Sequence, residues 1–171
     1  PRINGRQYYK NCYICGDIDF IFGSATAYFE HCTLESLLRT KASAQSDLVS
    51  TTSTLHDSGS DTSALCHSNS DMVQKNYTLP PIQGYVTAAS TPESQEYGYV
   101  FSNCKLISKD CPPNSVYLGR PWRNYAKTVF LECALGNHIH ECGFHDWKKE
   151  DARNTVLYAE YRNYPASSAD T

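Results

Sequence analysis

The sequence predicts an all-β protein, a partial right-handed parallel β-helix in which short strands stack as successive coils. One pattern recurs: an aromatic residue, any residue, a polar residue, cysteine, any residue, and Ile or Leu. Its copies are YKNCYI from Tyr9, FEHCTL from Phe29, FSNCKL from Phe101 and FLECAL from Phe130, with YAEYRN from Tyr158 as a degenerate fifth that has Tyr161 in the cysteine place. Short strands at intervals of 20 to 29 residues, without helical periodicity between them, are typical of a solenoid.

Half of the eight cysteines belong to this repeat. In a stack of coils, equivalent positions lie above one another at about 4.8 Å, so these cysteines should form an internal ladder. Free cysteine packs well as a small buried hydrophobe, which favours thiols over disulfides here. The ladder residues are Cys12, Cys32, Cys104 and Cys133. Disulfides among the remaining four stay open, and these are Cys15, Cys66, Cys111 and Cys142.

One interval between the repeats is long and has its own composition. From Thr40 to Asp71, 14 of 32 residues are Ser or Thr and none is aromatic, which is typical of a solvated excursion. The rhythm resumes at GYVTAAS, Gly84 to Ser90. We therefore expect one partial β-helix domain over residues 1–171, with a Ser/Thr-rich insertion at about 37–83.

Composition and charge exclude several classes of partner. Fifteen Lys and Arg against 18 Asp and Glu give a net charge of −3, too balanced to indicate nucleic-acid binding or attraction to an anionic membrane. No apolar run reaches the roughly 20 residues that cross a bilayer, and the first residues lack the apolar core of a signal peptide. The function must therefore be inferred from individual sites.

The stretch GDIDFIFG places two carboxylates at the front of an apolar strand. Strict alternation turns Asp17, Asp19 and Ile21 outward and turns Phe20 and Phe22 inward. An outward aspartate is usually a solubilising residue. On a well-covered surface, however, an ionised carboxylate is costly unless it is paired.

A partner for such a carboxylate is offered by YLGRPWRNYAKTVFLEC. Gly119 and Pro121 are expected to interrupt the strand, and Arg120 and Trp122 are spaced to present a cation and a flat ring together. An arginine beside an aspartate favours the ionised carboxylate that a nucleophile needs, and a tryptophan face suits stacking of a sugar ring. The alternative is structural, with the arginine on backbone carbonyls and the tryptophan closing the core.

These segments together resemble one protein family. ICGDIDFIFG matches the signature of the pectin methylesterases (pectinesterases), which are right-handed parallel β-helix enzymes. The resemblance continues through GYVTAAST, YLGRPWRNYAKTVFLEC, NHIHECGFHDW and YAEYRN, and so covers most of the chain outside the Ser/Thr-rich insertion. It implies a carbohydrate esterase that hydrolyses the C6 methyl ester of galacturonate in homogalacturonan, giving pectate and methanol without a cofactor.

The resemblance also implies roles for single residues. Asp19 matches the nucleophile and Arg120 the arginine that pairs with it, whereas Asp17 occupies a variable position. Trp122 and Phe22 match aromatic residues of the substrate cleft, although Phe22 needs a bend after Phe20 to face outward. Phe144 stands where relatives often carry a cleft tryptophan. The expected partner is pectin, the expected location is secreted, extracellular or cell wall, and the full-length protein is expected to be a monomer.

Two elements of the family mechanism do not occur in this sequence. These are an acid/base aspartate in a Gln-Asp-Thr-Leu-like motif shortly before the signature, and the glutamines that hold the oxyanion. The chain therefore resembles an internal piece of a domain of about 300 residues. A general acid or base contributes about 10² to 10⁴ in rate, so we expect the isolated chain to be impaired.

Other readings remain open. A polygalacturonase-like glycoside hydrolase would need carboxylates about 5 to 9.5 Å apart, which Asp17 and Asp19 can just meet. A calcium-dependent, pectate-lyase-like reaction is a further rival, and a non-catalytic, degenerate pectin-binding copy is another. For the histidines His138, His140 and His145 we expect surface or loop positions rather than a metal site, since no ligand geometry is forced.

Overall fold

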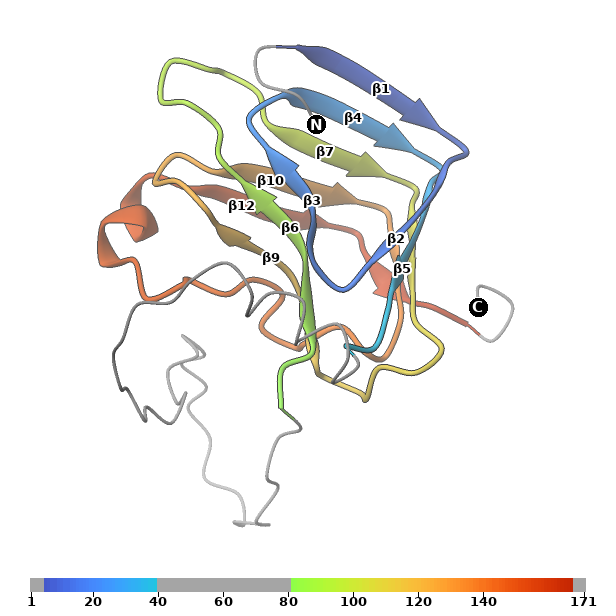
Figure 1. Ribbon diagram of the computed structural model, residues 1–171. Coiled ribbons are helices and arrows are strands. Elements are labelled where there is room, and N and C mark those ends of the chain that lie inside the picture. Colours follow the sequence, from blue (N-terminus) through green and yellow to red (C-terminus); the bar gives the residue numbers. More distant parts are fainter. Residues whose placement is uncertain (1–4, 40–80, 168–171) are drawn as a thin grey trace, which may run out of the picture.

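The chain winds into a right-handed parallel β-helix, as predicted. The computed structural model describes residues 5–39 and 81–167, and all strand pairs there are parallel. Three sheets form the walls of the stack (Figure 1). Every wall is crossed once per coil, because the chain passes from one sheet to the next before it returns one strand spacing higher.

The first sheet has the order β1-β4-β7-β10-β12, with β1 (Arg6–Lys10), β4 (Thr26–Glu30), β7 (Tyr99–Ser102), β10 (Lys127–Leu131) and β12 (Leu157–Tyr161). The second has the order β13-β11-β8-β5-β2, with β2 (Tyr13–Gly16), β5 (Thr33–Ser36), β8 (Lys105–Ile107), β11 (Ala134–Leu135) and β13 (Tyr164–Pro165). The third has the order β3-β6-β9, with β3 (Ile18–Gly23), β6 (Gly84–Ala89) and β9 (Val116–Pro121). A short 3₁₀ helix, η2 (Glu150–Asn154), precedes β12.

The aromatic positions of the repeat form a stack inside the first sheet. Tyr9 stacks on Phe29 with ring centroids 4.7 Å apart, Phe29 on Phe101 at 4.5 Å, and Phe101 on Phe130 at 4.4 Å. The strand register pairs these residues directly across neighbouring coils. Offset stacking of buried rings adds to the burial of their area, so one residue type per coil specifies the core.

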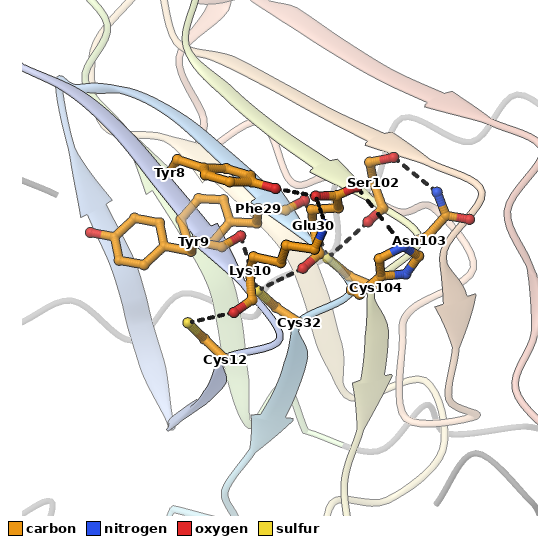
Figure 2. Close-up of polar contacts among 11 residues, drawn as sticks. Tyr8, Tyr9, Lys10, Cys12, Phe29, Glu30, Cys32, Ser102, Asn103 and Cys104 are labelled. Carbon is orange, nitrogen blue, oxygen red and sulfur yellow. Dashed lines mark hydrogen bonds and ion pairs between the residues drawn. The ribbon is translucent and has the colours of Figure 1, made fainter.

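The repeated cysteines lie at the corner between the first and second sheets, and the predicted ladder is confirmed. All four are free thiols, and the backbone of each cysteine position bonds to the next coil. Cys32 donates to the carbonyl of Tyr9 and Cys104 to that of Phe29, both at 3.5 Å, which Figure 2 shows beside the aromatic stack. The thiols thus fill the corner of the core rather than crosslink it.

The polar residue before each cysteine makes the corner itself. These residues have φ near +50°, and they are Asn11, His31, Asn103 and Glu132. One left-handed residue turns the strand through the corner and costs about 1 kcal/mol, which the stacked carbonyl and amide pairs offset. The polar position of the repeat is therefore the position at which the backbone turns the corner.

The fifth copy of the repeat is shifted relative to the sequence alignment. The register pairs Thr128 with Tyr158 and Leu131 with Tyr161, two residues away from the predicted match. The cysteine place is taken by Asn163, whose Oδ1 accepts from the backbone nitrogen of Cys133 at 2.9 Å. Tyr161 is exposed. The prediction for Tyr161 was wrong because the left-handed corner residue of this coil is Arg162, with φ +51°, so the strand continues through Tyr161 and the corner comes two residues later than in the match.

The long interval lies between β5 and β6. The strand β5 ends at Ser36 and β6 begins at Gly84, where the rhythm was expected to resume. The Ser/Thr-rich stretch at 40–71 and Cys66 lie outside the described residues.

Of the other cysteines beyond the ladder, Cys15 and Cys111 are free, whereas Cys142 is disulfide-bonded. No helix in the described ranges is long and apolar enough to span a bilayer.

Candidate active site

A bulge in β3 places Asp19 on the outer face of the three-stranded sheet. Ile18 pairs with Tyr85 but Ile21 pairs with Thr87, so β3 carries one residue more than β6 over this interval. Asp19 sits in the bulge with φ +52°, a conformation that aspartate tolerates better than most residues. The bulge thus supplies an extra residue without displacing the strand.

The bulge also reverses the alternation expected for the strand. Ile21 is buried at 3% exposure and Phe22 is exposed at 51%, the opposite of the strict pattern. The bend needed to turn Phe22 outward therefore exists, but it lies at Asp19, before Phe20 rather than after it. Asp17 has a different partner from Asp19, since its Oδ1 accepts from the backbone nitrogen of Ile18 at 2.8 Å.

Arg120 on β9 forms a two-pronged ion pair with Asp19. Its Nε donates to Oδ1 at 3.0 Å and its Nη2 donates to Oδ2 at 2.7 Å. The two side chains retain only 17% and 21% of their exposure, so water screens the pair weakly. A bidentate arginine fixes the plane of the carboxylate as well as its charge. Residues 101 positions apart in the sequence are thereby joined into one unit.

Both faces of the Arg120 guanidinium are covered by rings. Its Cζ lies 3.8 Å from the centroid of Tyr85 and 3.9 Å from the centroid of Trp147. Two rings cannot occupy the same side of one carbon at this distance, so they lie on opposite faces. Neither ring was predicted from the sequence to have a role, although Trp147 is one of only two tryptophans in the chain.

Phe22 and Trp122 form an exposed aromatic pair in the row of Arg120. Their centroids are 5.5 Å apart with ring planes at 51°, and Trp122 is 39% exposed. The register places Ala88 between Phe22 and Arg120, and that small side chain leaves the two neighbours unobstructed. The arrangement offers apolar faces to a flat ligand on the sheet face that carries Arg120.

The segment around Arg120 is more regular than expected. Gly119 and Pro121 both belong to β9, and the strand ends only after Pro121. Glycine is required at 119 because a Cβ there would lie 2.0 Å from Thr87 Oγ1. The missing side chain thus permits close approach of β6 and β9, and no interruption is needed to present Arg120.

Lys149 holds the backbone at the end of β9, directly after Arg120. Its Nζ donates to the carbonyls of Pro121 at 3.0 Å and Trp122 at 2.6 Å. Burial lowers the pKa of Lys149, and the nearby positive charges of Arg123 and Arg120 lower it further. This contact ties the residues before η2 to the end of β9.

Phe144 is placed differently from the other aromatic candidates. It stacks on Tyr158 at 4.4 Å and tilts against Phe130 at 6.2 Å, packed against the core. It also lines a pocket of about 260 Å³ with Pro121 and Lys149 among its walls. Burial raises the pKa of the Tyr158 hydroxyl, and the negative charge of Asp19 adds to the effect. A role for Phe144 in the cleft stays a prediction.

The three histidines are loop residues, but two of them are not at the surface as expected. His138 and His140 are 1% and 4% exposed. His140 stacks on Tyr117 at 4.3 Å, and His145 meets Tyr117 edge-on. Burial lowers the pKa of His138 to about 4, so this side chain is neutral near pH 7. Within residues 5–39 and 81–167, no group of three or more His, Cys, Asp or Glu is placed to hold a metal.

The geometry suits nucleophilic chemistry at a carbonyl carbon. A carboxylate fixed by a bidentate arginine has one defined orientation, and the adjacent exposed rings supply a binding surface. The nearest other aspartate in sequence, Asp17, accepts from the backbone nitrogen of Ile18, whereas Asp19 is paired with Arg120, so the two carboxylates have different partners.

Comparison with known proteins identifies relatives over nearly the whole chain. A family model described as Pectinesterase matches residues 3–80 and 60–171. "Probable pectinesterase/pectinesterase inhibitor 13" of Arabidopsis thaliana is 33% identical over 97% of the chain. "Pectinesterase 31" of the same plant is 29% identical over 98% of the chain.

Solved structures agree with this match. A crystal structure of pectin methylesterase in complex with a hexasaccharide aligns with TM-score 0.62 at 27% identity over 98% of the chain. The pectin methylesterase from Aspergillus niger aligns with TM-score 0.63 at 28% identity over 96% of the chain. The chain spans 22% and 39% of the two Arabidopsis relatives and 46% and 40% of the two solved chains.

Proposed function

Because the chain belongs to the pectinesterase family, we propose that its protein hydrolyses the C6 methyl esters of homogalacturonan to pectate and methanol. The observation that carries the proposal is the two-pronged Asp19–Arg120 pair beside the Phe22–Trp122 rings. Since the chain spans less than half of the relatives described above, the activity is proposed for the whole protein and not for this segment alone.

In the proposed reaction Asp19 is the nucleophile. One carboxylate oxygen forms a bond to the C6 carbonyl carbon, the bond from that carbon to the methoxy oxygen breaks, and methoxide leaves as methanol after taking a proton. Water then attacks the covalent acyl intermediate, giving the free galacturonate and restoring the Asp19 carboxylate. Arg120 keeps the carboxylate in the orientation for attack.

Trp122 and Phe22 are proposed to bind the sugar rings of pectin. Their exposed faces flank the ion pair, and stacking on apolar sugar faces positions the ester without neutralising the nucleophile. Phe144 is proposed as a further contact from the wall of the neighbouring pocket. No cofactor is required by this mechanism.

The wider setting follows from the same proposal. We propose a single partial β-helix domain over residues 1–171 with the insertion at about 37–83. The substrate is a cell-wall polymer, so the protein is proposed to act as a secreted monomer, extracellular or at the cell wall. The acid/base and oxyanion groups are proposed to come from parts of the protein beyond this chain, which leaves the isolated chain impaired.

The reaction class is tested by incubating the whole protein with methyl-esterified pectin. We expect methanol to be released while the concentrations of reducing ends and of ultraviolet-absorbing unsaturated ends stay constant. New reducing ends without methanol would instead identify a glycoside hydrolase, and unsaturated ends a lyase. In the same assay the 171-residue chain should release methanol at least about 10²-fold more slowly than the whole protein.

A further inference from the structure

The loop that carries Trp147 is held in an unusual conformation next to Arg120. Trp147 and Lys148 are consecutive residues with φ +54° and +55°. Left-handed backbone is unfavourable for any residue with a side chain, and here two such residues are adjacent. Such a conformation persists only where surrounding contacts enforce it, which makes the position of the Trp147 ring a specified feature of the fold.

The enforcing contacts come from both sides of the loop. The backbone nitrogen of Trp147 donates to His145 Nδ1 at 2.9 Å, and that of Lys148 donates to Asp146 Oδ1 at 2.8 Å. Asp146 also accepts from Arg153 of η2 at 2.9 Å. On the other side, the Nζ of Lys149 is bound to the carbonyls of Pro121 and Trp122. The loop is therefore tied to the strand that carries Arg120.

The ring held in this way covers one face of the Arg120 guanidinium, and Tyr85 of β6 covers the other. We call the three residues Tyr85, Arg120 and Trp147 the arginine clamp. A cation between two aromatic faces is attracted to both, and the attraction grows where water is excluded. With both faces occupied, the guanidinium has little freedom to rotate out of the plane that meets Asp19.

We propose that Trp147 is a positioning residue for the Asp19–Arg120 pair. It acts through Arg120, since its ring contacts the guanidinium and not the carboxylate. This inference rests on the proposed function for its catalytic consequence, but the clamp itself does not. Its removal should slow the chemical step more than it weakens substrate binding, because misorientation of a reacting group costs rate.

The kinetic test compares Trp147→Leu, which removes the flat face, with Trp147→Phe, which keeps a smaller one. In the whole protein, Trp147→Leu should lower kcat about tenfold with KM within about twofold, and Trp147→Phe should recover most of that loss. In an Arg120→Ala background, Trp147→Leu should have no further effect. An equal loss in that background would show that Trp147 does not act through Arg120, and would overturn the proposal.

A second readout does not depend on activity. Hydrogen exchange at the Nε–H of Arg120, followed by nitrogen-15 NMR, should accelerate about tenfold in Trp147→Leu and much less in Trp147→Phe. Unchanged exchange in Trp147→Leu would overturn the clamp even if kcat falls. If the wild-type protein releases no methanol, the proposed function fails, while the exchange result still decides the clamp.

The matched control is Arg162, which lies 5.2 Å from the centroid of Tyr161 and 3.9 Å from Glu132. Here too an arginine lies over an aromatic ring and near a carboxylate, but the arginine and the ring are exposed and neither belongs to the clamp. Tyr161→Leu should leave kcat and the Arg120 exchange rate unchanged. A loss equal to that of Trp147→Leu would show a general effect on folding, which contradicts a positioning role.

Discussion

The first sheet and the three-stranded third sheet are walls of the same coils, yet one is regular and the other is not. In the first sheet, one aromatic residue from each of the first four coils stacks on the next at 4.4 to 4.7 Å. In the three-stranded sheet, β3 contains a bulge, Asp19 is left-handed, and the side chains of each row differ. Repetition therefore supplies the core, and departures from repetition supply the site.

The contrast extends to charge. The buried side chains of the first sheet are mostly aromatic, none of them is charged, and they need no ionic partner. The outer face of the three-stranded sheet holds an aspartate and an arginine with about a fifth of their exposure or less, which is tolerable only because each satisfies the other. The two walls should therefore respond to different substitutions.

The substitution with the largest expected effect is at Asp19, and Asp17 is its control. Asp19→Asn should lower kcat for methanol release about 10⁴-fold, because an amide is not a nucleophile. Asp17→Asn, two residues away, should stay within about threefold, since Asp17 accepts from the backbone nitrogen of Ile18 and is given no role in the proposed reaction. Equal losses in both variants would mean that the bulge has no special role.

A substitution in the regular wall should affect stability and not the chemistry. Phe101 is fully buried between Phe29 and Phe130, so Phe101→Ala should lower the free energy of unfolding by about 3 to 5 kcal/mol. The exposed Tyr161→Ala should change it by less than about 0.5 kcal/mol. Urea denaturation of both variants measures this difference, and similar values would contradict the stacked core.

The burial of His138 should make the free energy of unfolding depend on pH. Its pKa is lowered to about 4 by burial, so between about pH 6.5 and 4 the unfolded chain binds a proton that the folded chain does not. The contribution is intact above pH 6.5, and about 3 kcal/mol is lost as the pH falls to 4. Urea denaturation across this range should show a shallower loss for His138→Phe than for wild type. An identical slope would contradict the assignment.

The smallest expected effect comes from replacing Arg120 with lysine, and Arg162 serves as its control. Arg120→Lys should lower kcat about 10²-fold, because lysine provides a point charge but neither a fork for Asp19 nor a flat face for Tyr85. Arg162→Lys should leave kcat within about twofold, since Arg162 lies on an exposed surface. Activity retained in Arg120→Lys would show that charge alone is sufficient.

The sequence predicted the regular wall well and the site incompletely, for a physical reason. The repeat of aromatic residue and cysteine is a local pattern, so the parallel β-helix, the thiol ladder and the pairing of Asp19 with Arg120 were all anticipated, the last from a family signature. The register predicted for the fifth copy was wrong because the corner of that coil is at Arg162 and not at Glu160, which the sequence pattern does not reveal.

Features that depend on contacts between coils were not predictable from one chain. Nothing in the pattern of GDIDFIFG distinguishes a regular strand from one with an extra residue at Asp19. Trp147 reaches Arg120 only because two left-handed residues turn its loop, and neither is a glycine that would signal such a turn. The burial of His138 and His140 likewise depends on the coil below them.

The measurement that tests the central claim most directly is capture of the covalent intermediate. The whole protein is mixed rapidly with a methyl-esterified oligogalacturonate and quenched in acid. It is then digested, and the masses of its peptides are measured by mass spectrometry. We expect an oligogalacturonyl adduct on the peptide that contains Asp19, formed together with the first methanol and absent from Asp19→Asn. Methanol release with that peptide unmodified, or an adduct on another residue, would contradict the assignment of Asp19 as the nucleophile.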